Sequence, residues 1–129
     1  MQKLVYEKIY DKLEKLGILE LKEHKKLHSE GFMDLSIDIL HEDEEVKVIA
    51  MAHNYIQNGD VMADPDMEIK IHKRIKMAEA LTFQQDPLLF QRVYHEVDGK
   101  TFVNKKVKTQ LNTFLNSWLN NIKQQGFKA

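Results

Sequence analysis

One dipeptide, Asn58-Gly59, constrains the fold of this chain more than any other feature. It separates two runs in which apolar and polar residues alternate, 46–57 and 60–71. Asn-Gly is typical of a type I′ turn, because both central residues of that turn need a positive φ angle. The sequence therefore predicts a long β-hairpin over residues 46–71 that turns at this dipeptide.

The position of the turn also predicts how the two strands pair. Counting back from the turn places His53 opposite Asp64 and Met51 opposite Asp66. One face of the hairpin is then apolar and carries Val46, Val48, Ala50, Ala52, Met67, Ile69 and Ile71. The other face carries His53, Tyr55, Asp64, Asp66 and Glu68. A slip of one residue would mix the two sets, so the pattern favours this register.

Pro65 tests this arrangement, because proline has no backbone N–H to donate to a neighbouring strand. In the predicted register Pro65 faces Ala52 in a pair that exchanges no hydrogen bonds, so the missing donor affects the far side of the strand. The second strand is therefore expected to be a sheet edge at Pro65 or to carry a β-bulge there.

The segments around the hairpin predict an α+β fold. Residues 1–17 contain an amphipathic helix over 3–16, and residues 24–103 are expected to form an antiparallel meander sheet of five to six strands. The other strands are predicted at 24–28, 32–40, 80–85, 88–97 and 101–103. Residues 18–23 fit either a helical turn or a loop, and 72–79 fit either a loop or one to two helical turns.

The C-terminal segment gives the clearest helix, over residues 104–125. Its apolar residues recur at helical spacing and are expected to pack on one face of the sheet. Asn104 is a plausible N-cap, and Gly126-Phe127 fits a Schellman stop with an apolar residue folding back. Residues 1–129 are therefore expected to form a single domain.

Composition excludes several classes of protein. With 129 residues, 43% of them apolar, the chain can bury one hydrophobic core. It has no cysteine, which rules out disulfides and thiol chemistry. The chain has no apolar run of about 18 residues or more, so no membrane segment is expected. The charged N-terminus does not fit a signal peptide, and we expect a cytoplasmic protein.

Charge is segregated along the chain although the net charge is only −1. Residues 30–68 contain eleven acidic residues and one lysine, whereas residues 100–129 contain six lysines and no acid. Two interpretations stay open. The two regions either partly neutralise each other on the surface, or one of them meets a charged partner.

The polar face of the hairpin is the candidate site, formed by His53, Tyr55, Asp64, Asp66 and Glu68. A carboxylate that orients an imidazole supports general bases and metal ligands, but it also occurs as a structural cross-strand pair. No serine or cysteine has the setting of a nucleophile. We therefore interpret the face as a binding patch and assign no catalytic residue, no metal ligand and no cofactor.

A metal-dependent hydrolase or nuclease is the alternative. His53, Asp64 and Asp66 could hold Mg²⁺ or Mn²⁺ on the same face, with Glu68 beside them. Asp60 and Glu68-Ile69-Lys70 superficially resemble the Asp…Glu-x-Lys arrangement of a metal-dependent nuclease fold, but the spacing is short. A net charge near zero argues against binding nucleic acid through the lysine-rich helix. The sequence does not indicate an oligomeric state.

Four segments carry a resemblance to a known family: FMDLSIDIL, AHNYIQNGDVMADPDME, LTFQQD and WLNNIKQQGF. They are similar to an uncharacterised domain-of-unknown-function family of small bacterial proteins, many carried on phages and plasmids. The resemblance extends from Leu27 to the C-terminus and implies no activity, only a mobile-element setting. The sequence as a whole thus predicts a small cytoplasmic binding protein that acts through a protein partner, as an accessory or inhibitor in such an element.

Overall fold

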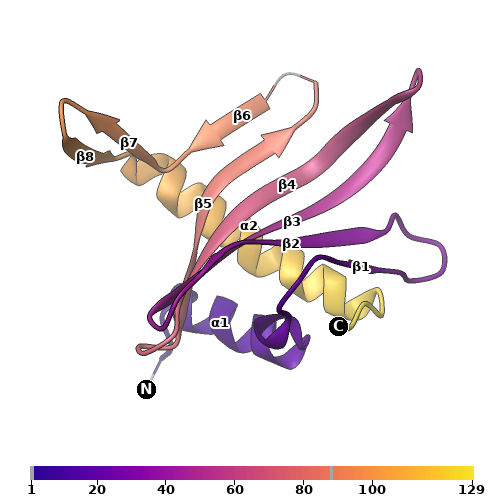
Figure 1. Ribbon diagram of the computed structural model, residues 1–129, viewed down its shortest axis with the longest axis horizontal. Helices are drawn as coiled ribbons and strands as arrows, with labels where there is room; N and C mark the ends of the chain where they lie inside the picture. Colours follow the sequence, from indigo (N-terminus) through magenta and orange to yellow (C-terminus); the bar gives the residue numbers. More distant parts are fainter. Residues whose placement is uncertain (1, 88) are drawn as a thin grey trace.

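The computed structural model describes residues 2–87 and 89–129, and it confirms the predicted α+β class. In chain order the elements are α1 (Val5–Lys15), the 3-10 turn η1 (Ile18–Glu20), β1 (Lys25–Leu27), β2 (Leu35–Glu42), β3 (Val46–Gln57), β4 (Asp60–His72), β5 (Met77–Gln85), β6 (Leu89–Arg92), β7 (Tyr94–Val97), β8 (Lys100–Val103) and α2 (Lys105–Gln124). Strands β1 to β6 form one antiparallel sheet in sequence order, and β7 pairs with β8 in a separate hairpin (Figure 1).

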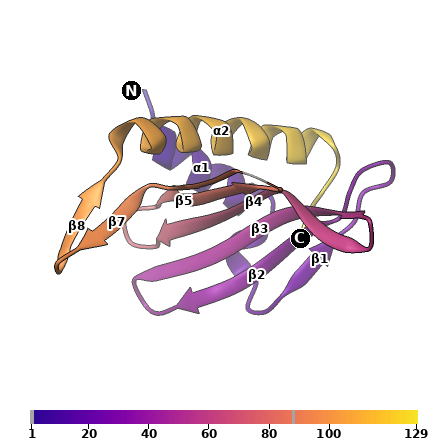
Figure 2. The same cartoon turned by 90° about the horizontal axis from the view of Figure 1, so that it is seen from above.

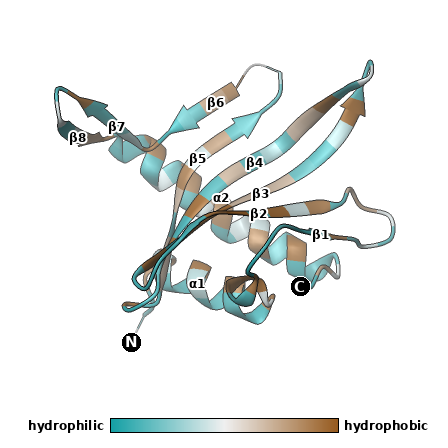
Figure 3. Cartoon of the chain, in the orientation of Figure 1, coloured by the Kyte–Doolittle hydropathy of each residue, from teal (hydrophilic) through white to brown (hydrophobic). Residues whose placement is uncertain are grey.

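Both helices lie on the same side of the six-stranded sheet (Figure 2). The hydrophobic core lies between the two layers and includes Leu13 of α1, Met67 and Ile69 of β4, and Leu115 of α2, all fully buried. Figure 3 shows polar and apolar bands alternating along β4 and α2, as expected for elements with one buried face. The described helices leave the other sheet face uncovered. None of them is long and apolar enough to cross a membrane.

The predicted ends of α2 are confirmed. The side chain of Asn104 accepts a hydrogen bond of 3.1 Å from the backbone N–H of Val107, which caps the first turn. At the other end Gly126 has a φ angle of 92°, and the N–H of Phe127 donates to the carbonyl of Ile122. This is the Schellman pattern, and it places Phe127, which is 2% exposed, against the core.

The hairpin turn is also confirmed. Asn58 and Gly59 have φ angles of 51° and 83°, and Gln57 pairs with Asp60 across the turn. From there to the pair of Asn54 with Ala63 the observed register is the predicted one. This end of β3 and β4 projects past the neighbouring strands (Figure 1).

Beyond Ala63 the predicted register is wrong, because β4 contains a β-bulge. Asp64 and Pro65 together face His53, so that Ala52 pairs with Asp66 rather than with Pro65. A bulge was one of the two outcomes expected from Pro65. The other, a sheet edge, is also met there, because β4 pairs with β5 only from Asp66 onward. Beyond the bulge the N–H of Ala63 donates to the Asp86 carboxylate at 2.7 Å, and the N–H of Asp86 donates to the Ala63 carbonyl.

The bulge reverses the predicted faces of β3. Ile49 and Met51 are fully buried and pair with Ile69 and Met67, whereas the shorter Val46, Val48 and Ala50 line the uncovered face and are only half-buried. One inserted residue has this effect because side chains alternate with a period of two along a strand. The larger side chains of both strands thereby meet in the core.

Three other predicted segments need correction. Of the two alternatives for residues 72–79, the loop is confirmed for residues 73–76 and the helix is wrong: His72 pairs with Met77 across a tight turn, in which Lys76 has a φ angle of 54°, and residues 77–79 belong to β5. The strand predicted at 88–97 is divided at the buried Val93 into β6 and β7, and Leu88 lies outside the described residues. The strand predicted at 32–40 begins later, at Leu35, and runs on to Glu42.

A buried lysine anchors the segment between α1 and β1. The side chain of Lys47 is 1% exposed, and its Nζ donates to the carbonyls of Leu19, at 2.9 Å, and Leu21. Nζ also lies 3.6 Å from Oε1 of Glu42. Burial lowers the pKa of Lys47. Because these two carbonyls accept hydrogen bonds from a side chain of β3, Lys47 connects the 3-10 turn to the sheet.

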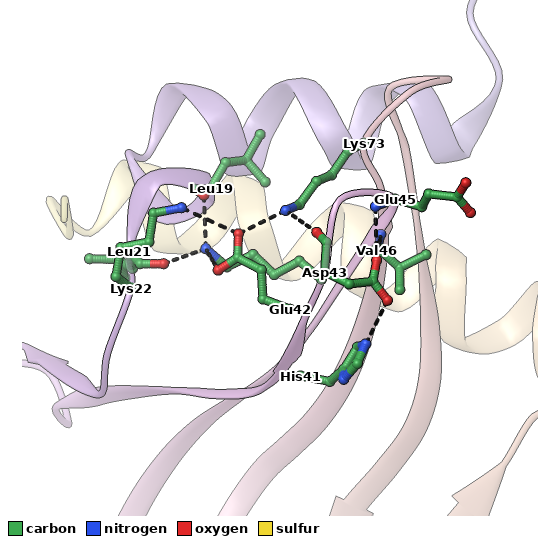
Figure 4. Close-up of polar contacts among 10 residues, drawn as sticks. Leu19, Leu21, Lys22, His41, Glu42, Asp43, Glu45, Val46 and Lys73 are labelled. Atoms are coloured by element: carbon green, nitrogen blue, oxygen red, sulfur yellow. Dashed lines mark hydrogen bonds and ion pairs between the residues drawn. The ribbon is translucent and has the colours of Figure 1, made fainter.

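Three lysines lie close to the carboxylate of Glu42 (Figure 4). Lys73 donates to its carboxylate at 2.8 Å and Lys22 at 3.3 Å, and Nζ of Lys47 lies 3.6 Å from it. Although Glu42 belongs to the acidic segment 30–68, its side chain is only 22% exposed. The hydrogen bond from Lys73 has the largest effect on the pKa of Glu42. Together with the hydrogen bond from Lys22 and the positive charge of Lys47, it lowers this pKa to about 2.

We expect Glu42 to make folding stability depend on acid pH. Its folded pKa of about 2 lies below the ordinary value of 4.5, so its stabilisation is complete above pH 4.5 and is lost as the pH falls toward 2. After allowance for solvent screening, the loss is about 1–2 kcal/mol. Denaturant unfolding of wild type and Glu42→Gln at several pH values measures it. Wild type loses more stability over this interval, whereas Glu44→Gln, in the exposed turn, behaves as wild type. Parallel curves for wild type and Glu42→Gln contradict the assignment.

Candidate binding face of the sheet

His53 does not belong to a polar face. It is 7% exposed, and its ring lies 5.7 Å from the ring of Trp118 and 5.6 Å from that of Phe127. Its Nδ1 donates to the backbone carbonyl of Asp34 at 3.2 Å. His53 is therefore a hydrogen-bonded core residue between the sheet and α2.

Asp66 and Glu68 lie on the opposite, uncovered face. Asp66 pairs with Ala52 and Glu68 with Ala50, and paired residues share a face. Successive residues of a strand point to opposite faces, so Ala52 points away from the side of its neighbour His53. The structure thus brings Asp66 and Glu68 together and separates both from the imidazole.

The other two predicted patch residues lie near the projecting end of the hairpin. Asp64 sits in the bulge, and its carboxylate accepts a hydrogen bond of 3.0 Å from the side chain of Gln85. Tyr55 is half-buried and pairs with Met62. The predicted patch of His53, Tyr55, Asp64, Asp66 and Glu68 is therefore not one surface.

The hydrolase alternative required His53, Asp64 and Asp66 on one face, and this arrangement is not formed because the bulge turns His53 to the core side while Asp66 stays on the uncovered side. Within residues 2–87 and 89–129, no group of three or more histidine, aspartate or glutamate side chains is placed to hold a metal ion.

Two rows of polar and small residues cross the uncovered face from strand to strand. The rows are Ser36, Ala52, Asp66 and Gln84, and Asp38, Ala50, Glu68, Thr82 and Arg92. Carboxylates on β2 and β4 thus flank the methyl groups of the two alanines on β3. Neighbouring strands lie about 4.8 Å apart, so Asp38 and Glu68 are about 10 Å apart at their backbones. A side chain from another molecule could lie between them over Ala50 and Ala52.

The electrostatics of this region single out Asp66. Burial raises its pKa, and the neighbouring carboxylates of Glu68, Asp38 and Asp86 raise it further. No lysine or arginine lowers it, and among the described residues its carboxylate takes part in no ion pair. A half-buried carboxylate among other carboxylates is stabilised by any cation that approaches it.

A groove occupies the other part of the same face, near β7 and β8. Figure 2 shows this hairpin extending from the sheet on the side away from α2. The groove has a volume of about 550 Å³. Val46, Val48 and Leu81 form its apolar floor, and Lys70, Tyr94 and Thr101 contribute polar groups. Leu81 lies at a register shift between β4 and β5, where it has no partner on β4.

A network of hydrogen bonds holds one wall of this groove. Glu79 accepts from the hydroxyl of Tyr94 through one oxygen and from Nε2 of His72, at 2.6 Å, through the other. Burial and then the bond to Glu79 raise the pKa of Tyr94. The ammonium of Lys108 on α2 lies over the rings of Tyr6 and Tyr94, at 5.5 and 5.6 Å. Both oxygens of Glu79 are therefore engaged.

These observations define a class of protein: an α+β domain whose sheet is packed by helices on one face and carries charged and apolar groups on the other. The family described as a domain of unknown function, DUF6908, matches residues 5–128. The chain belongs to this family, and the match includes α1, which lay outside the resemblance seen in the sequence. No curated protein and no solved structure matches the chain.

Sequence analysis missed Asp38, Lys70, Tyr94 and the anchoring Lys47. For the two residues on β3 and β4 a signal existed. Placing the bulge at Pro65 and counting onward would have turned Lys47 into the core and brought Val48 to the uncovered face beside Lys70, which already lay on the polar face of the predicted hairpin. No comparable signal pointed to Tyr94, because its role depends on the hydrogen bond to Glu79.

Proposed function

We propose that this protein binds a protein partner through the uncovered sheet face, and that the partner presents an arginine or lysine side chain to Asp66 and Glu68. The observation that carries the proposal is the half-buried carboxylate of Asp66, whose pKa is raised by burial and by neighbouring carboxylates. A cation from a partner would remove this repulsion and form charge-assisted hydrogen bonds.

The shape of the face favours arginine in particular. The small side chains of Ala50 and Ala52 leave room for a planar guanidinium, with Asp38 on one side and Asp66 and Glu68 on the other. A guanidinium presents five N–H donors in a fixed fork that matches carboxylates, whereas an ammonium acts as a point charge. The acidic segment 30–68 supplies these carboxylates, so a cationic partner would interact with the acidic part of this charge-segregated sequence.

The biological setting belongs to the same proposal. The sequence resemblance implies genes carried on phages and plasmids, where small accessory proteins and inhibitors act on partner proteins. Identification of the genes that flank this one tests the setting, and chromosomal housekeeping neighbours in most genomes contradict it.

Titration with a defined peptide tests the binding face. An acetylated and amidated Ser-Arg-Ser-Arg-Ser peptide is added to ¹⁵N-labelled protein, and the amide signals of Ala50, Ala52 and Asp66 are followed by NMR. We expect these signals to shift in wild type, with affinity about tenfold weaker in Asp66→Asn/Glu68→Gln. Binding also weakens as the pH falls through the raised pKa of Asp66, because the protonated acid attracts no cation.

The matched control is Glu44→Gln/Glu96→Gln, which changes the net charge equally at two exposed positions. It keeps the wild-type affinity if the face is specific. Equal weakening in both double variants, or shifts confined to other strands, overturns the proposal. A partner captured from host lysate supports it only if Asp66→Asn/Glu68→Gln loses that partner and the control retains it.

A further inference from the structure

We infer that the groove beside β7 and β8 is a binding site for a small amphipathic anion, with an apolar body and one carboxylate or sulfonate group. Its volume of about 550 Å³ falls within the roughly 300–1,000 Å³ of typical small-molecule sites. Two other recesses on the described surface have about 290 and 270 Å³. The groove is therefore large enough for a ring system or a short acyl chain.

The floor of the groove fits an apolar body. Val46 and Val48 of β3 and Leu81 of β5 line it, and all three are only half-buried. Apolar side chains in a concave surface that is open to water gain free energy when a ligand displaces that water. The two bulges create this floor: the one at Pro65 turns the valines outward, and the one at Leu81 adds a side chain that pairs with nothing on β4.

Lys70 is the group in the groove that would attract an anion, although the carboxylate of Glu79 also lines the groove. Lys70 lies between Val48 and Glu79 in the cross-strand register, and within the two described ranges no carboxylate comes within ion-pair distance of its Nζ. Glu79 would be its natural partner, but both oxygens of Glu79 accept from His72 and Tyr94. The ammonium of Lys70 is thus available to an anionic group.

The opposite wall adds a donor that can orient this group. Thr101 of β8 is exposed and lines the groove across from the sheet, so its hydroxyl can donate to an anionic oxygen. Asp38, Asp66 and Glu68, the carboxylates of the proposed protein-binding face, do not line the groove, although Glu68 lies two residues from Lys70 on the same face of β4. The two sites are therefore adjacent but share no lining residue, and either one can exist without the other.

Two matched dyes test the inference. 8-Anilinonaphthalene-1-sulfonate is an aromatic anion, and N-phenyl-1-naphthylamine is the same body without the sulfonate. We expect the sulfonate dye to bind the folded protein with one-to-one stoichiometry by fluorescence titration. Lys70→Met weakens the binding of the anionic dye by about tenfold and leaves the binding of the neutral dye unchanged, because only the charge is removed. Thr101→Trp, which fills the groove from an exposed position, weakens both dyes.

Controls locate the site. Lys26→Met removes an exposed charge on β1, and Ile56→Ser/Val61→Ser removes the apolar pair at the hairpin tip, where the two side chains are 76% and 71% exposed. Neither variant changes dye binding if the groove is the site. 3-Phenylpropionate displaces the anionic dye, and 3-phenylpropylamine does not. Any one of four results overturns the inference: wild type binds no dye, Lys70→Met binds the anionic dye as tightly as wild type, the amine displaces the dye as well as the acid does, or the hairpin-tip variant loses binding.

Discussion

Replacing Lys47 with methionine is expected to lower the free energy of unfolding by about 3 kcal/mol, although the two side chains are similar in length. The carbonyls of Leu19 and Leu21 then lose the ammonium that donates to them, inside a site where Lys47 is 1% exposed. An unsatisfied buried acceptor costs about 1–3 kcal/mol. Glu42 keeps Lys22 and Lys73, so the loss stays near the lower end for a broken buried ion pair.

Chemical denaturation followed by circular dichroism measures this loss. Lys26→Met serves as the control, because Lys26 is exposed on β1 and its replacement is expected to change stability by less than about 0.5 kcal/mol. Equal stability of Lys47→Met and wild type would show that the anchoring of η1 to the sheet adds no net stability.

Replacing Ile49 with alanine is expected to lower the free energy of unfolding by about 2–5 kcal/mol, whereas Val48→Ala lowers it by less than about 1 kcal/mol. Ile49 is fully buried and pairs with Ile69, so truncation leaves a cavity between the sheet and the helices. Val48 lies on the uncovered face, where solvent fills the space that a shorter side chain leaves. Urea unfolding of the two variants and wild type measures both values.

This pair of variants tests the bulge at Pro65 directly. Without the inserted residue Val48 would face the core and Ile49 would face outward, and the order of the two losses would be reversed. Met67→Ala and Glu68→Ala give a matched pair on β4, with the larger loss again expected at the fully buried Met67.

The fold class was predictable because most elements have strong local signals. The Asn58-Gly59 turn, the N-cap of Asn104 and the Gly126-Phe127 stop each depend on a few adjacent residues, and the structure confirms all three. For residues 72–79 the sequence left loop and helix open, and it did not indicate that only 73–76 form a tight turn between two strands. Its geometry follows from the pairing of His72 with Met77, which is a contact between strands.

The candidate site was less predictable, and Pro65 explains why. The sequence indicated that a bulge was one way to accommodate this proline. Only the assembled sheet shows that a bulge forms at Pro65, at the place where the pairing of β4 with β5 ends. The inserted residue then exchanges the two faces of β3, moves His53 under α2 and leaves Asp66 and Glu68 on the uncovered side.

The amino-acid sequence by itself determined where the chain turns, where its last helix begins and ends, and that helices would cover an antiparallel sheet. Those features arise from backbone preferences and periodicities within a few residues of one another. The tertiary structure alone decided which side of each strand faces water, that Lys47 is buried, and that Lys70 forms no ion pair with any of the described residues. Such outcomes depend on the register between distant segments, and a single inserted residue reverses them.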